Sequence, residues 1–307
     1  MTTVTDKIWS LTTTAVGRRH VYAYLSILPA LVVLILFTAY PVLYNLNLAF
    51  HKHVLTAPGQ HPFVGTKNFA ELFRNPGLLR SFQTTGEFTA VTMLLTIVLG
   101  VLIALLLNEN FFGARALQVL ILIPWAIPVV MAGIIWRWMF AGNVGVVNGL
   151  LYSLGLIDKY YSFFGNPVTA KMSLVIARVW KDVPLAAILL LATLQVIPQE
   201  LYDAAKIDGC GAWAAFRHIT FPFLRPTLTV LLILQTLIGL VTFDLVYVMT
   251  GGGPADATTL VAWYSYTEIF THLNLGRGAA LAFIIALITL ILAVFYFMAL
   301  RSEEMYT

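Results

Sequence analysis

The sequence predicts an all-α membrane protein that crosses the bilayer several times. Sixty per cent of its 307 residues are hydrophobic, and only 10% are charged. Soluble domains carry about 25% charged residues, so this chain has too little charge to cover a water-exposed surface of its size. Its apolar segments are each long enough to cross about 30 Å of hydrocarbon as a helix. The six segments are Tyr22–Leu46, Phe88–Asn108, Leu117–Met139, Met172–Ile197, Thr227–Met249 and Gly278–Leu300.

These segments predict one six-helix membrane domain, residues 22–300, between the short terminal segments 1–21 and 301–307. The first apolar run follows Arg18 and Arg19 and is longer than the roughly 7–15-residue core of a signal peptide. We therefore expect it to be retained as the first span. Each span is expected to be a helix, because a lipid-exposed backbone must satisfy its own hydrogen bonds. Lys and Arg are divided almost evenly between the two sets of loops, so charge alone does not set the orientation.

Several predicted spans contain proline. Pro41 is in the first span, Pro124 and Pro128 are in the third, and Pro184 is in the fourth. Proline removes a backbone donor, so each should kink or locally open its helix. Such openings are typical of helices that line a watery path, and they also occur in ordinary packed membrane helices.

Two loops between spans also have a predicted structure. Residues 51–87 are polar and are expected to contain a short helix at Asn68–Phe73. The connection Ala141–Lys171 contains several Gly and Tyr residues and is expected to lie along the membrane surface.

The sequence excludes several kinds of chemistry. It contains neither a His-Glu-x-x-His zinc motif nor a Gly-x-x-x-x-Gly-Lys-Ser/Thr nucleotide loop, and all six His residues lie outside the spans. Its single cysteine, Cys210, forms no disulfide within the chain and no cysteine-based metal site. A nucleic-acid partner is not expected, because no run of five basic residues occurs. The chain is therefore expected to be no enzyme and to need no cofactor.

A few polar residues lie within the predicted spans, where charge is costly and usually faces a protein interior or water. Lys181 and Asp244 are the candidates for a translocation pathway, and Trp180 and Tyr247 are candidates for stacking against a sugar. The alternatives are structural ion pairs, snorkelling to the interface and a belt of interfacial aromatic residues. The other charged residues within spans are Arg137, Arg178 and Asp182.

The polar loop 198–226 between the fourth and fifth spans is the most informative segment. Residues 199–206 are predicted to form a short helix in which Ala204 and Ala205 let another surface approach closely. Gly209 is expected to end this helix with positive φ. Ile219 belongs to the apolar face of a second helix, which Pro222 and Pro226 should bound. A helix, a glycine turn and a second helix between two spans indicate a docking element for a soluble partner.

These residues resemble the Glu-Ala-Ala loop of permease subunits in binding-protein-dependent ABC importers. The family pattern is Glu-Ala-Ala, three residues, Gly, nine residues and Ile-x-Leu-Pro, and the spacing from Ala205 to Pro222 fits it without a gap. Asp203 replaces the Glu and Phe221 replaces the Leu, which keeps the charge and the apolar character. Further runs are similar to the carbohydrate-uptake branch, the maltose- and glycerol-3-phosphate-type sugar permeases. These runs are Phe63–Phe69, Val179–Pro184 and Phe243–Pro254.

The resemblance implies the type I permease fold, with six spans and both termini in the cytoplasm of a bacterial cell, in its inner membrane. It implies a second homologous permease, two cytoplasmic ATPase subunits, an extracytoplasmic solute-binding protein and a carbohydrate-like solute as partners. The loop 198–226 then contacts the ATPase and carries its closure to the spans. The coupling residues on this interpretation are Asp203, Ala204, Ala205, Asp208, Gly209, Ile219 and Pro222.

Two other classes of protein stay open at the level of sequence. A secondary transporter needs an acidic residue near the midplane for its coupling ion, and Asp244 is the one isolated candidate. Uptake that survives ATP depletion while the proton gradient is kept would favour it. A membrane scaffold or receptor predicts no solute flux and no co-purifying ATPase.

Overall fold

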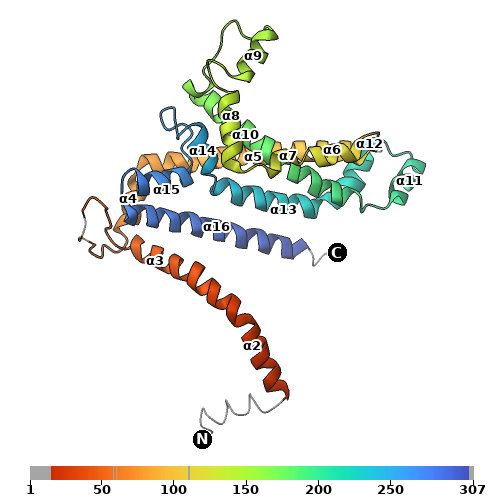
Figure 1. The fold of residues 1–307 in the computed structure, drawn as a ribbon. Helices are drawn as coiled ribbons and strands as arrows, with labels where there is room; N and C mark the ends of the chain where they lie inside the picture. Colours follow the sequence, from red (N-terminus) through yellow and green to blue (C-terminus); the bar gives the residue numbers. More distant parts are fainter. Residues whose placement is uncertain (1–14, 58, 60, 110, 304–307) are drawn as a thin grey trace.

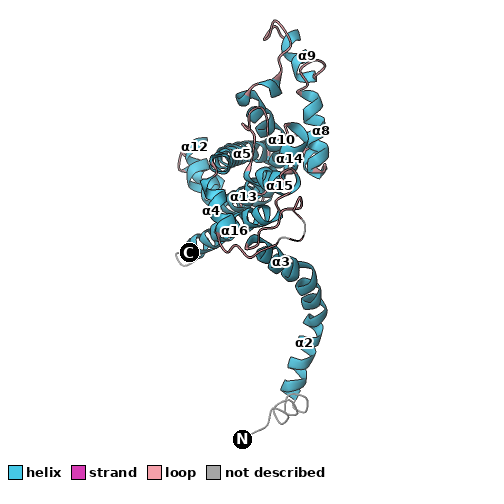
Figure 2. Ribbon diagram, turned by 90° about the vertical axis from the view of Figure 1, so that its left-hand side faces the viewer, coloured by secondary structure: helices cyan, strands magenta, loops and turns pink. Residues whose placement is uncertain are grey.

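The computed structural model describes residues 15–303 except 58, 60 and 110. Most of the predicted N-terminal segment 1–21 and residues 304–307 of the predicted tail lie outside the described residues. All regular elements in the described part are helices, and the strand-type pairing there is limited to two isolated bridges. Figure 2 shows this helical architecture, which confirms the predicted all-α class.

Helices α5, α10, α13 and α16 form the body of the molecule and run along one another (Figure 1). Their bounds are Pro76–Asn108, Pro167–Leu194, Phe221–Leu240 and Leu275–Glu303. Small residues let these helices approach closely: a Cβ built on Gly100 of α5 would lie 3.0 Å from the Cβ of Ala186 on α10. Close contact through small residues is how helices gain dispersion energy in lipid, where neighbouring apolar chains offer no hydrophobic gain.

The first span is a helix that leaves this body. It consists of α2 (Ala15–Leu34), a π-helical turn η1 (Ile35–Ala39) and α3 (Tyr40–Ala49). The π turn stands immediately before Pro41, so the predicted local opening occurs there. Only the α3 end packs on α16, and none of the apolar window in Tyr22–Ala49 is buried within the chain (Figure 1).

The predicted short helix in the first polar loop is confirmed as α4 (Lys67–Arg74). The following helix α5 begins at Pro76, twelve residues before the predicted start of the second span at Phe88. Asn75 caps it by accepting a hydrogen bond from the Gly77 N–H at 2.8 Å, and Pro76 occupies the first helical turn. Hydropathy detected only the apolar part of this helix, whereas its polar first three turns extend beyond the apolar segment.

The predicted third span, Leu117–Met139, is not one continuous helix. The chain forms α6 (Ala114–Leu120), α7 (Ile123–Ala126) and α8 (Val129–Met139), and the direction changes by 94° between the segments Ala114–Ala126 and Val129–Met139. The break lies at Pro128, because proline has no backbone N–H and forces the residue before it out of the helical region. Ile127 accordingly has ψ of 132°.

The predicted fifth span, Thr227–Met249, is wrong at both ends. The helix starts earlier, because α12 (Ala212–Ala215) and the π turn η3 (Phe216–Thr220) continue directly into α13 as one stretch, Ala212–Leu240. Pro222 and Pro226 therefore do not bound a separate helix. At the other end α13 stops at Leu240, and a separate short helix α14 (Asp244–Met249) follows. Residues 241–243 are Val-Thr-Phe, so neither Gly nor Pro stands in the break itself.

The fourth predicted span, Met172–Ile197, corresponds to α10, which is uninterrupted through Pro184. The predicted opening at this proline is therefore absent. By length and composition, the described residues contain four helices that could cross a membrane, or five if the bent α6–α8 segment counts as one. Helix α10 is not among these helices, because it contains the charged residues Arg178, Lys181 and Asp182. Its 28 residues nevertheless give a length of about 42 Å.

The connection after α8 forms a compact hairpin that contains α9 (Val146–Ser153) and a 3₁₀ turn η2 (Phe163–Gly165). One buried asparagine holds it together. Asn148 donates to the carbonyls of Ala141 and Tyr161 at 3.2 and 2.9 Å, and its Oδ1 accepts from the Tyr161 N–H at 3.0 Å. The last helix before α16, α15 (Val261–Phe270), packs on α5 and α16 at the end of the body where α4 lies (Figure 1).

We expect Asn148→Leu to loosen this hairpin. The substitution leaves buried backbone groups of the hairpin without partners, at a cost of about 2 kcal/mol or more. Trypsin cleavage after the exposed Lys159 should therefore accelerate in the purified protein, while Asn143→Leu, at an exposed position of the same hairpin, should leave the rate unchanged. Equal rates in both variants would show that Asn148 does not hold the hairpin.

Candidate functional site

Two places in the fold carry the predicted functional residues, and the first is the loop after α10. Helix α11 (Gln199–Ile207) ends in a Schellman motif. The N–H of Gly209 donates to the Lys206 carbonyl at 3.0 Å, and the N–H of Cys210 donates to the Ala205 carbonyl at 2.9 Å. Gly209 has φ of +77°, which confirms the predicted positive φ. A Cβ at Gly209 would meet nothing within 4 Å, so the glycine is required by its backbone angle alone.

The predicted coupling residues fall into two groups in the structure. Asp203, Ala204, Asp208 and Gly209 are exposed on α11 and its C-terminal turn. Ala205 is partly buried and lines a pocket of about 560 Å³ between α11, the α12–η3 segment and the end of α5.

Ile219 and Pro222 belong to the second group, which faces inward. Both are partly buried, and Ile219 packs against the cluster that contains Leu190, Leu224 and Leu231. The hydroxyl groups of Tyr202 and Thr220, 2.9 Å apart, tie α11 to the same segment. The loop therefore presents α11 to the outside and anchors it on the base of α13.

Asp203 forms an ion pair within α11, with its Oδ1 3.4 Å from Lys206 Nζ. Both side chains are well exposed, at 60% and 71%. A pair in water at this distance contributes at most about 1 kcal/mol. Asp203 is consequently available to a partner at little cost.

The second place is a polar pocket of about 310 Å³ between the two broken spans. Helix α10 forms its floor, the α7–α8 break contributes one wall, and the break after α13 contributes the other. The lining residues are Trp125, Val129, Arg178, Lys181, Asp182, Ile238, Val241, Thr242, Phe243 and Asp244.

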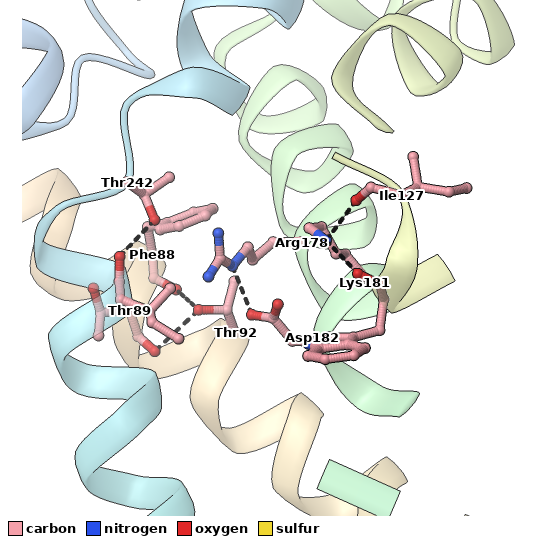
Figure 3. A network of polar contacts seen from close by, with 10 residues as sticks. Phe88, Thr89, Thr92, Ile127, Arg178, Lys181, Asp182 and Thr242 are labelled. Carbon is pink, nitrogen blue, oxygen red and sulfur yellow. Dashed lines mark hydrogen bonds and ion pairs between the residues drawn. The ribbon is translucent and has the colours of Figure 1, made fainter. Parts of the chain in front are cut away.

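Lys181 connects α10 to the broken third span. Its ammonium group donates to the backbone carbonyls of Trp125 and Ile127 at 2.9 and 2.8 Å (Figure 3). Both carbonyls lie beside the Pro128 break, where the regular helical pattern is interrupted. The buried lysine thus satisfies the acceptors that the break leaves inside the body.

The neighbouring charges pair with each other. Arg178 Nε donates to Asp182 Oδ2 one helical turn away at 2.6 Å, and both side chains are less than 10% exposed. Figure 3 shows this pair beside Lys181, on the same helix. Asp182 therefore pairs with Arg178, while the contacts of Lys181 go across to another span.

The structure brings only some of the predicted pathway residues together. Lys181 and Asp244 line the same pocket, and Asp244 is exposed at the start of α14. Trp180 instead packs edge-on against Trp136 of α8, with ring centroids 5.7 Å apart. Tyr247 does not line the pocket and belongs to a cluster of aromatic rings on α14 and α15, which reaches the pocket at Phe243.

The sequence indicated this aromatic cluster only weakly. Tyr247, at 51% exposure, lies 5.8 Å from both Trp263 and Tyr266, and Phe243 lies 4.8 Å from Tyr266, all between ring centroids. The sequence does contain a run of aromatic residues in 263–270. These residues contact α14 only because the chain breaks after α13. The pocket residues Arg178 and Asp182 were likewise noted in the sequence but not assigned to the pathway.

With this geometry established, comparison with known proteins shows which family the chain belongs to. Residues 96–303 match the model of the binding-protein-dependent transport system inner membrane component. The trehalose/maltose transport system permease protein MalF of Thermococcus litoralis is 37% identical over 94% of this chain and 96% of its own length. The sulfoquinovosyl glycerol transport system permease protein SmoG of Agrobacterium fabrum is 34% identical over 92% of this chain and 91% of its own.

A solved structure has the same fold. A bacterial ABC transporter involved in the import of the acidic polysaccharide alginate superposes with a TM-score of 0.80 over 93% of this chain and 96% of its own, at 23% identity. The chain is therefore a member of the family of inner-membrane permease components of binding-protein-dependent transport systems, and it is a multi-pass membrane protein. This finding confirms the resemblance predicted from the 198–226 loop.

We expect Lys181→Met to impair transport without preventing assembly. The two carbonyls at the break lose a charged donor in a buried site, and the cost of about 1.5–3 kcal/mol corresponds to roughly tenfold or more in the population of the intact pocket. Uptake by the reconstituted complex should fall accordingly, and size-exclusion chromatography should still show the complex. Lys52→Met, at an exposed loop position, is the control. Unchanged uptake in Lys181→Met would mean that these two bonds do not matter for transport.

Proposed function

We propose that this chain is one of two homologous permeases of an ATP-driven sugar importer and that loop 198–226 couples it to separate ATPase subunits. The observation that carries the proposal is α11 itself, a short exposed helix fixed by a glycine-dependent turn between two long helices. The named substrates of the two relatives, trehalose or maltose and sulfoquinovosyl glycerol, support a carbohydrate-like solute. The absence of a nucleotide loop from the sequence requires that ATP be bound elsewhere.

The proposed topology has six spans, formed by α2–α3, α5, α6–α8, α10, α12–α13 and α16. An even number of spans places both termini on one side, which we assign to the cytoplasm. Two features of the body support this assignment. The C-terminal end of α16 lies at the same end of the body as α11, and the loop containing α4 lies at the opposite end (Figure 1). An extracytoplasmic binding protein would then approach the α4 end.

The need for a second permease is supported by the apolar surface that this chain leaves without a partner. Helix α2 extends away from the body, as does the α8–α9 hairpin (Figures 1 and 2). Broken spans such as α6–α8 are tolerated at membrane depth only where protein or a water-filled cavity surrounds them. A homologous subunit seated against these projecting elements would enclose the pocket between the two breaks.

In the proposed coupling, one long helix transmits movement from loop 198–226 to the polar pocket. The continuous stretch Ala212–Leu240 begins in the coupling loop and ends beside the polar pocket, at Ile238 and the following break. Its 29 residues span about 44 Å. A movement of α11 reaches this helix through the Tyr202–Thr220 contact and the packed Ile219 side chain. Closure of the ATPases against α11 would therefore shift the wall of the pocket.

The polar pocket and the aromatic cluster are the proposed pathway. The α7–α8 break and the break after α13 form its two walls, and Lys181 holds one of them to α10. Arg137 holds α8 to α14 by donating to the Val248 carbonyl at 2.8 Å. Alternating access then requires that these contacts differ between two global states. The exposed rings around Tyr247 offer flat apolar faces for a sugar.

We expect Gly209→Val to uncouple the complex. A β-branched residue disfavours the left-handed angle by about 1–2 kcal/mol, so the turn after α11 shifts and displaces its exposed face. Uptake of maltose or trehalose and its stimulation of ATP hydrolysis should both be lost while the complex still assembles. Gly209→Asn is the matched control, because asparagine tolerates the left-handed region and should retain most activity.

Normal uptake and normal solute-stimulated ATP hydrolysis in Gly209→Val would remove the main support for the coupling role. Uptake that persists after ATP depletion, with the proton gradient kept, would instead favour a secondary transporter.

We expect Asp244→Asn to reduce uptake with assembly intact. The exposed carboxylate lines the polar pocket opposite the charges of α10, so its removal changes the field in the proposed pathway. Asp158→Asn, on the exposed part of the α9 hairpin, provides the control for loss of one negative charge. Initial uptake rates over a range of sugar concentrations give the measurement. Identical rates for Asp244→Asn and the unmodified complex would assign Asp244 to the surface rather than the pathway.

A further inference from the structure

An apolar groove lies between α5 and α10 and takes no part in the sites described above. Its volume is about 380 Å³, and its walls are almost entirely carbon. Several lining side chains are well exposed, including Val91 of α5 at 45% and Met172 of α10 at 55%. The groove is therefore open along its length and offers apolar surface to whatever lies beside these two helices.

One end of the groove is marked by an ion pair between its two walls. Lys171 Nζ on α10 lies 2.9 Å from Glu87 Oε2 on α5, and Gln83 donates to Glu87 Oε1 at 2.9 Å. The side chains are 39% and 48% exposed, so both charges remain accessible. The mouth of an apolar groove thus presents one positive and one negative charge side by side.

The position of this pair along the helices places it at a boundary of the hydrocarbon. Asn108, the last residue of α5, lies 21 residues after Glu87, which corresponds to about 32 Å of helix. Leu194, at the end of α10, lies 23 residues after Lys171, about 35 Å away. Both distances match a hydrocarbon core of about 30 Å crossed with some tilt. The ion pair therefore lies at headgroup level, and the groove descends from it into one leaflet.

The dimensions of the groove suit a single hydrocarbon chain. Along α5 its lining extends from Thr84 to Leu95, about 16 Å of helix, which is about half the thickness of a hydrocarbon core and therefore the depth of one leaflet. The nearly all-carbon lining also excludes a sugar, which needs hydrogen-bonding partners.

We propose that this groove is a specific site for a zwitterionic phospholipid of the phosphatidylethanolamine type. One acyl chain fills the groove between α5 and α10, the phosphate lies at Lys171 and the headgroup ammonium lies at Glu87. The complementary charges distinguish this headgroup from an anionic one, which Glu87 repels. The bound lipid fastens the α5–α10 contact at the end of the body opposite the coupling loop. The inference depends on the proposed placement of α5 and α10 across the membrane.

The first experiment tests whether a bulky side chain placed in the groove excludes the lipid. We expect the purified complex to retain phosphatidylethanolamine through detergent exchange, measured by native mass spectrometry and by lipid extraction. Val91→Trp should reduce the retained lipid roughly tenfold, because excluding two methylene groups from the groove has that effect. Val98→Trp is the matched control: it lies on the same face of α5 seven residues on, it is 46% exposed, and it does not line the groove. Equal retention in the two variants would overturn the site.

The second experiment tests the headgroup. Lys171→Met and Glu87→Gln should abolish the preference for phosphatidylethanolamine over phosphatidylglycerol, measured as the gain in thermal stability of the complex on adding each lipid. Lys67→Met removes a comparable exposed pair with Glu71 on α4 and should keep the preference. The absence of any preference in the unmodified complex would overturn the headgroup assignment.

A photo-crosslinking side chain at position 91 identifies the occupant directly. Labelling of phospholipid supports the proposal, whereas labelling of the second permease would show that a protein helix covers the groove and would overturn it. These readouts measure bound lipid and not transport. A failed lipid site is therefore distinguishable from a failed transport assignment, which uptake and ATP hydrolysis test.

Discussion

Backbone groups inside a membrane must be hydrogen-bonded, and the rest of this structure depends on how the chain meets that constraint. Most of the body meets it with long helices. The α7–α8 break does not, and there Lys181 supplies from α10 the donors that the carbonyls of Trp125 and Ile127 lack. One buried lysine thus satisfies the backbone at a bend of 94°. The bend in turn creates a wall of the polar pocket.

The same constraint explains why the pocket and the coupling loop are connected through a helix and not through a flexible link. The stretch Ala212–Leu240 contains two prolines, yet it stays helical because a π turn before Pro222 accommodates the missing donor. An unbroken helix transmits displacement over its whole length. The break comes only after Leu240, next to the pocket, so one rigid element would join the proposed motion at α11 to a change at the pocket.

Two apolar parts of the surface are left uncovered by the chain itself. Helix α2 buries none of its apolar window within the chain, and the α5–α10 groove carries a pair of opposite charges at its mouth. The first feature fits a large protein neighbour, and the second, being apolar and charged at its mouth, fits a lipid. On the proposed function, the subunit is completed by its surroundings, which are a homologous chain, an ATPase and the bilayer.

Composition was sufficient for the membrane class and for the six apolar segments, because transfer into hydrocarbon depends on local composition. The short helix α4 in the first polar loop was also predicted. The turn at Gly209 was equally predictable, since a left-handed angle after a helix selects glycine. The start of α5 at Pro76, the end of α13 at Leu240 and the continuity of α10 through Pro184 were not. Nor were the roles of the charges: Asp182 pairs with Arg178, while Lys181 bonds carbonyls more than fifty residues away. Hydropathy measures how a segment partitions into lipid, whereas a break in a helix is decided by whether a distant side chain can satisfy it, and only the tertiary structure contains that information.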